Sequence, residues 1–139
     1  MQWRSAASIE MISGLIALRQ FLRYWQPPFA ALWATGLAFL GYASLAPQLA
    51  PPTGIAGVEL RLDTFIHVGV YLCFAAWPWI IGNDVRRAWL ATAIVAILSV
   101  AFEIGQAYVP GRSASWDDLA ANALGVVLGV WLGRRIAAL

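Results

Sequence analysis

The chain has 139 residues, of which 61% are apolar and 12% are charged. A soluble globular domain carries about 25% charged residues, so this composition excludes an ordinary soluble globule and indicates an integral membrane protein. The formal net charge of +2 comes from arginines near the ends of apolar segments, which do not form the basic patch typical of nucleic-acid binding. Cys73, the single cysteine, lies within an apolar segment and is expected to pack in the core.

Residues 1–26 are predicted to form an amphipathic helix that lies along the membrane headgroups. One face of this helix collects the apolar residues Met11, Leu15, Leu18, Leu22 and Trp25. The apolar stretch at 12–18 is short, and no small-residue cleavage site follows it. We therefore expect the segment to stay attached and not to be a signal peptide.

Residues 27–139 contain four apolar segments, each long enough to cross a hydrocarbon core of about 30 Å at a rise of about 1.5 Å per residue. Proline, glycine and asparagine separate the segments, and a short extended piece is expected at 58–62. The predicted fold class is all-α, a four-transmembrane-helix bundle preceded by the amphipathic helix. The expected spans are residues 29–45, 62–81, 88–109 and 117–132.

Arginine placement predicts the orientation of these spans. Only Arg61 and Arg112 fall on one side of the membrane, and the other seven arginines fall on the opposite side. Because arginine-rich loops face the cytoplasm, we expect both termini to be cytoplasmic. The hairpin between the third and fourth spans then opens on the outer face.

Polar side chains gather at the outer ends of three spans. Asp63, His67 and Tyr71 are each four residues apart, so they lie along one helix face, and Glu103 and Gln106 are neighbours on another. Counted from the expected helix ends, several of these groups lie roughly 5 to 12 Å inward. Since polar groups at this depth are costly, they must either satisfy one another or surround a polar ligand. The candidate ligand-binding residues are Asp63, His67, Tyr71, Glu103, Gln106, Arg112, Asp118 and Asn122.

The fourth span carries two further signals. Gly125, Gly129 and Gly133 are spaced by four residues, which predicts a face that packs closely on another helix. Ser115 is expected to cap the start of this span. Arg112 lies just before that start, where it and the free N–H groups could hold a phosphate or carboxylate, or where it could pair with Asp118 or Glu103.

A family resemblance follows from the order of these residues. The pattern is Asp63-Thr-Phe-Ile-His67 with Tyr71, then Glu103-x-x-Gln106, then Pro110-Gly-Arg112 followed by Asp118, Asn122, Gly125 and Gly129. This pattern closely resembles the VanZ-like family of small bacterial membrane proteins. The family often has a lysine directly after the first aspartate, where this chain has Thr64.

The resemblance implies a multi-pass protein of the bacterial cytoplasmic (inner) membrane and a role in the cell envelope. The family's namesake is associated with low-level resistance to the glycopeptide antibiotic teicoplanin. The resemblance implies no established enzymatic activity, so it supplies a context and not a mechanism.

Three functions remain open at this level. The first is binding of a polar or lipid-linked ligand, such as a lipid-linked cell-wall precursor, in a pocket of the outer leaflet. The second is a membrane-embedded enzyme acting on lipid phosphates, with Glu103 or His67 as general base and Arg112 stabilising negative charge. The third is an accessory subunit that docks a larger membrane protein complex. Membrane lipids are expected partners in each case, and no nucleic acid, cofactor or metal is expected, since no motif or spacing calls for one.

Overall fold

The computed structural model describes residues 26–47, 59–82 and 84–138, together with helical residues at 10–11, 13–14, 16–18 and 20–21. At residues 59–63 it describes the backbone alone. The remainder of the predicted N-terminal amphipathic segment lies outside the described residues. Four long helices follow it: α2 (Gln26–Leu45), α3 (Glu59–Ile81), α4 (Val85–Gln106) and α5 (Trp116–Ala137).

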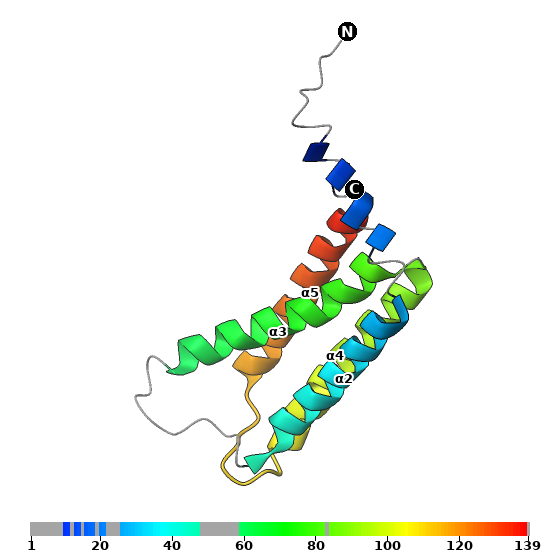
Figure 1. Ribbon diagram of the computed structural model, residues 1–139. Coiled ribbons are helices and arrows are strands. Elements are labelled where there is room, and N and C mark those ends of the chain that lie inside the picture. The colour runs from blue at the N-terminus through cyan, green and yellow to red at the C-terminus, as the bar shows by residue number, and fades with distance from the viewer. Residues whose placement is uncertain are drawn as a thin grey trace.

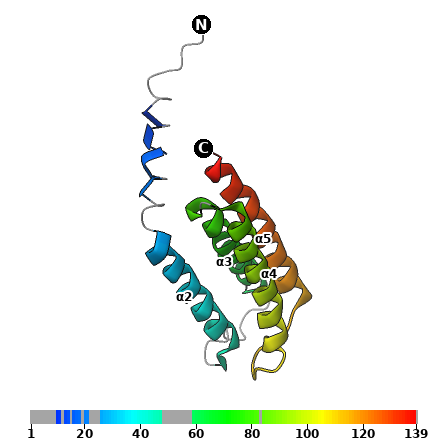
Figure 2. The same cartoon turned by 90° about the vertical axis from the view of Figure 1, so that its right-hand side faces the viewer.

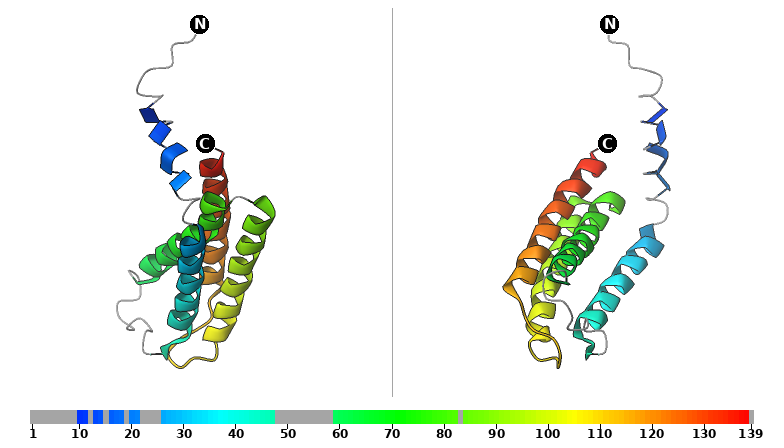
Figure 3. Two further views of the ribbon diagram at one scale, coloured as in Figure 1. Left: turned by 45° about the vertical axis from the view of Figure 1, so that its right-hand side comes forward. Right: turned by 90° about the vertical axis from the view of Figure 1, so that its left-hand side faces the viewer.

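Each of the four helices is long and apolar enough to cross a membrane. The predicted all-α fold with four spanning helices and a short N-terminal helix is therefore confirmed. Figures 1 and 2 show α3, α4 and α5 grouped together, with α2 lying along one side of the group. The start of α2 and the end of α5 lie at one end of the bundle, and the α4–α5 hairpin lies at the other (Figure 3).

Several predicted boundaries were wrong. α3 begins at Glu59, so the extended piece expected at 58–62 is helical from residue 59 onward. α4 ends at Gln106, three residues early, because Tyr108 and Val109 donate their N–H groups to Gly105 and Gln106 in tight turns. α5 continues past residue 132 to Ala137, with Arg134 and Arg135 in its last turn, where they complement the helix dipole.

Cys73 is exposed on α3, so its expected place in the core was wrong. The physical reason is that an apolar residue of a membrane helix loses nothing by facing hydrocarbon. Burial instead follows the contact faces of the helices. Leu37, Tyr71 and Val95, from α2, α3 and α4, form the buried apolar cluster.

The glycine face of α5 lies directly on α3. A Cβ added at Gly125 would lie 2.5 Å from the carbonyl oxygen of Val68, and one at Gly133 would lie 2.8 Å from that of Ala76. At Gly129 an added Cβ would press on the carbonyl oxygen of Leu72. The two backbones therefore approach more closely than any larger residue on this face of α5 would permit.

Side chain to backbone hydrogen bonds join α2 to α3. Pro78 lies inside α3 and has no N–H to donate to the carbonyl of Phe74, four residues earlier. Trp33 of α2 supplies that donor, with 2.9 Å between its Nε1 and the Phe74 oxygen. Trp77 donates in the other direction, to the carbonyl of Phe29, at 3.2 Å. Because lipid cannot satisfy a carbonyl group, the Trp33 bond compensates for the proline.

Candidate functional site

His67 and Asn122 connect α3 to α5 near the hairpin end of the bundle. The Nδ1 atom of His67 and the Oδ1 atom of Asn122 are 2.8 Å apart. An amide oxygen only accepts, so His67 donates from Nδ1 in this arrangement. Asn122 is 1% exposed, whereas His67 is half-buried and part of its side chain is accessible.

Glu103 connects α4 to the start of α5. Its Oε1 atom accepts the backbone N–H of Ser115 at 2.5 Å, although the residue is only 6% exposed. Tyr71 of α3 is 4% exposed and lies close enough to Glu103 for an electrostatic interaction. The buried carboxyl group thus faces both the α5 start and the α3 helix.

Ser115 caps α5. Its hydroxyl oxygen accepts from the N–H groups of Asp117 at 3.2 Å and Asp118 at 3.4 Å. The prediction that Ser115 is the N-cap is confirmed. Two of the N–H groups that were expected to help hold an anion are therefore already occupied by this side chain.

The hairpin is fastened to the end of α2. Arg112 donates from Nη2 to the carbonyl of Ala43 at 2.7 Å, and Gln106 donates to the carbonyl of Ser44 at 3.3 Å. Gly111 turns the chain at a φ of 80°, in the left-handed region that favours glycine. These contacts fix the position of the half-buried Arg112 relative to α2.

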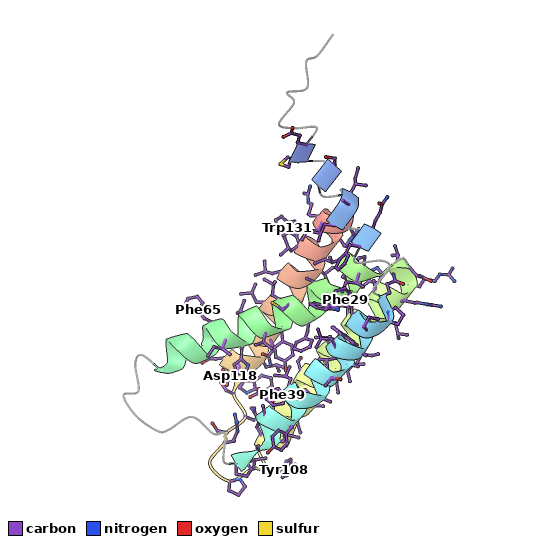
Figure 4. The ribbon with its side chains drawn as sticks, in the orientation of Figure 1. Phe29, Phe39, Phe65, Tyr108, Asp118 and Trp131 are labelled. Carbon is purple, nitrogen blue, oxygen red and sulfur yellow. The ribbon has the colours of Figure 1, made fainter. Side chains whose placement is uncertain are left out.

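The structure therefore brings most of the candidate residues into one layer at the hairpin end of the bundle. Glu103 contacts Ser115, Ser115 contacts Asp118, and Asp118 lies one helical turn before Asn122, which contacts His67. Figure 4 labels Asp118 at the start of α5, beside α3. Glu103, Gln106, Asn122 and Tyr71 are buried, whereas His67, Arg112 and Asp118 are half-buried. Asp63 lies on α3 one turn before His67, but its side chain lies outside the described part of the chain.

Three of these side chains, those of Glu103, Gln106 and Arg112, bond to backbone groups, which residue patterns do not reveal. Neither the carbonyls of Ala43 and Ser44 nor the N–H of Ser115 carries a signature in the sequence. Trp33 had no role assigned from the sequence. Pro78 leaves the Phe74 carbonyl without its usual N–H donor, and that missing donor was a usable signal. Within the described ranges, no group of three or more His, Cys, Asp and Glu side chains is arranged to hold a metal ion.

Comparison with known protein families identifies a match. A model of the VanZ/LLP1 family matches residues 62–137, which comprise nearly all of α3 and the whole of α4 and α5. Searches of curated proteins and of solved structures found no match. The matched region contains the complete polar layer and the glycine face of α5.

Proposed function

Because this chain belongs to the VanZ/LLP1 family and is a multi-pass membrane protein, we propose that its hairpin end binds the polar headgroup of a lipid or lipid-linked ligand. The ligand would enter from the outer leaflet of the bacterial inner membrane, with both termini in the cytoplasm. A lipid-linked cell-wall precursor is the proposed class. Such a ligand would also connect the chain with the glycopeptide resistance that the family resemblance implies.

The observation that supports this proposal most strongly is the graded burial of the layer. Its buried members bond to half-buried neighbours, as in the case of Asn122 with His67 and Glu103 with the backbone N–H of Ser115. The rim consists of His67, Arg112 and Asp118, which are half-buried. A polar layer that only held the helices together would need no ionisable side chains at its rim. Apolar residues at those positions would avoid the cost of placing charges in lipid.

Arg112 is the proposed contact for the headgroup. Its guanidinium group is permanently charged and has the planar fork that suits phosphate and carboxylate groups. The bond to Ala43 holds it at the hairpin end and reduces the entropy lost when a ligand binds. Asp118 lies in the first turn of α5, at the same end of the bundle, so it would favour ligands that also carry hydrogen-bond donors, such as sugars.

Binding of a polyprenyl phosphate to the purified protein in nanodiscs tests the proposal. We expect Arg112→Gln to weaken binding about tenfold or more, since a charge-assisted hydrogen bond contributes about 1.5–3 kcal/mol. Arg112→Lys should retain part of the affinity because it keeps the charge. Arg135→Gln removes the same charge at the other end of the bundle and should leave binding unchanged.

Equal affinity of Arg112→Gln and the wild type, with both proteins monodisperse and helical, would exclude the proposed headgroup contact. Release of phosphate from the probe during the same incubation, abolished by Glu103→Gln, would instead establish the enzyme alternative. A stable membrane partner that survives mutation of the layer would favour the accessory-subunit alternative.

A further inference from the structure

A groove lies at the end of the bundle opposite the hairpin, between the start of α2, the end of α3 and the start of α4. Its volume is about 360 Å³. Most of its wall is apolar or aromatic, and it includes Ala30, Trp33, Trp77 and Pro78. Its polar lining residues, Gln26, Asp84 and Arg87, belong to the ends of the helices and therefore lie at the membrane surface.

A second cavity, of about 240 Å³, lies closer to the middle of the membrane. It shares Trp33 and Trp77 with the first and extends to Gly36 and Cys73. From Gln26 to Gly36 the helix rises about 15 Å, which is half of a hydrocarbon core of about 30 Å. The two cavities together thus cover the depth of one membrane leaflet.

Its aromatic walls are held in place by hydrogen bonds. Trp33 donates to the Phe74 carbonyl and Trp77 donates to the Phe29 carbonyl, so each indole is fixed to the opposite helix. Gln26 donates to the carbonyl of Ile81 at 2.7 Å and joins the same two helices at the membrane surface. A groove with fixed walls is already formed before a ligand enters, which lowers the entropy lost on binding.

Two arginines lie at the surface end of the groove: Arg87 lines it, and the exposed Arg86 precedes Arg87 on α4. Asp84 caps α4 by accepting from the N–H groups of Arg86 and Arg87, at 2.7 and 3.3 Å. The Nε atom of Arg87 lies 3.9 Å from Oδ2 of Asp84, and 88% of the Arg87 side chain is exposed. Residues 84–87 therefore carry two guanidinium groups against one carboxylate, and this excess positive charge beside the groove attracts anionic headgroups.

We propose that this groove binds one anionic phospholipid, with an acyl chain between α2 and α3 and the phosphate beside Arg86 and Arg87. The depth of the groove suits a chain from a single leaflet, and its charged end suits a phosphate. This lipid would fill the space enclosed by α2, α3 and α4. The site is independent of the headgroup site proposed at the hairpin end.

Native mass spectrometry of the full chain in mild detergent tests this proposal, with dioleoyl phosphatidylglycerol and dioleoyl phosphatidylcholine as probes. We expect the wild type to retain one phosphatidylglycerol in preference to phosphatidylcholine. Ala30→Phe should fill the groove and lower retention at least fivefold. The neighbouring Ala31 is exposed on α2 and does not line the groove, so Ala31→Phe is the matched control and should retain the lipid.

Arg87→Gln tests the headgroup contact without filling the groove. We expect it to reduce the preference for phosphatidylglycerol about fivefold, since one surface cation contributes about 1 kcal/mol. Arg135→Gln, at the same end but on α5, should keep the preference. Equal retention of the two lipids by the wild type, or unchanged retention by folded Ala30→Phe, would overturn the proposal. Arg112→Gln should leave this retention intact, which separates a failure here from a failure at the hairpin end.

Discussion

The Nδ1 atom of His67 on α3 and the Oδ1 atom of Asn122 on α5 lie 2.8 Å apart and join two helices that also meet along a glycine face. Interhelical hydrogen bonds in membranes contribute about 0.6 kcal/mol on average. The bond alone is therefore a modest source of stability. Its second effect is to orient the imidazole at the rim of the polar layer.

A double-mutant cycle measures this bond. We expect His67→Leu and Asn122→Leu each to lower the free energy of unfolding in bicelles, with a coupling energy of about 0.6 kcal/mol between them. Steric trapping or a denaturant titration can supply the four stabilities. Strictly additive effects would mean that the two side chains do not stabilise one another in the membrane.

Gly129 is expected to tolerate no added methyl group. In Gly129→Ala the new Cβ would press on the Leu72 carbonyl and lie 2.9 Å from the Cβ of Ala75, so the helices must separate. We expect a loss of about 1–3 kcal/mol, typical of overpacking. Gly69 of α3 has no atom within 4 Å of an added Cβ, so Gly69→Ala should be neutral or stabilising because alanine favours the helix. Similar stabilities for the two variants would contradict the close approach of α3 and α5.

Trp33→Phe should destabilise the protein by about 1–3 kcal/mol, because the Phe74 carbonyl loses its donor in a lipid environment. Adding Pro78→Ala should recover much of this loss. Alanine at 78 restores the N–H that α3 can donate to Phe74. Thermal unfolding of both variants in the same detergent checks the prediction, and a double variant no more stable than Trp33→Phe would refute it.

We expect folding to require an acceptor oxygen at position 103 and not a negative charge there. The Oε1 atom of Glu103 accepts the Ser115 N–H, and an amide oxygen at the same place can do so as well. Glu103→Gln should therefore fold with nearly wild-type stability, whereas Glu103→Leu should be destabilised by about 1–3 kcal/mol. Equal destabilisation of Glu103→Gln and Glu103→Leu in a thermal unfolding assay would show that the ionised carboxylate is what stabilises the hairpin.

The predicted orientation can be tested by cysteine labelling in a Cys73→Ala background. Tyr108 is 83% exposed in the hairpin, and Ala138 is exposed just after α5, at the opposite end. We expect Tyr108→Cys to react with a membrane-impermeant maleimide in intact cells, and Ala138→Cys to react only after permeabilisation. The reverse pattern would place the polar layer in the cytoplasmic leaflet and exclude an outer-leaflet ligand.

Local features of the sequence were sufficient to predict the four helices, the N-cap at Ser115 and the family. Apolar length, helix breakers and capping residues act within one segment, and the order of His67, Glu103, Arg112 and Asn122 along the chain is a motif, so both can be interpreted without the fold. The boundary errors at residue 59 and after Gln106 were errors of one turn or less. They arose where turns and caps compete with helix propensity.

The tertiary structure alone decided which partner each polar group would have. Glu103 bonds the Ser115 N–H, Arg112 bonds the Ala43 carbonyl and Trp33 bonds the Phe74 carbonyl. Every residue carries nearly the same backbone groups, so the choice among them depends on how the helices are packed. The groove lined by Trp33 and Trp77 follows from the same packing. These two residues lie on different helices and line one groove only when α2 lies against α3.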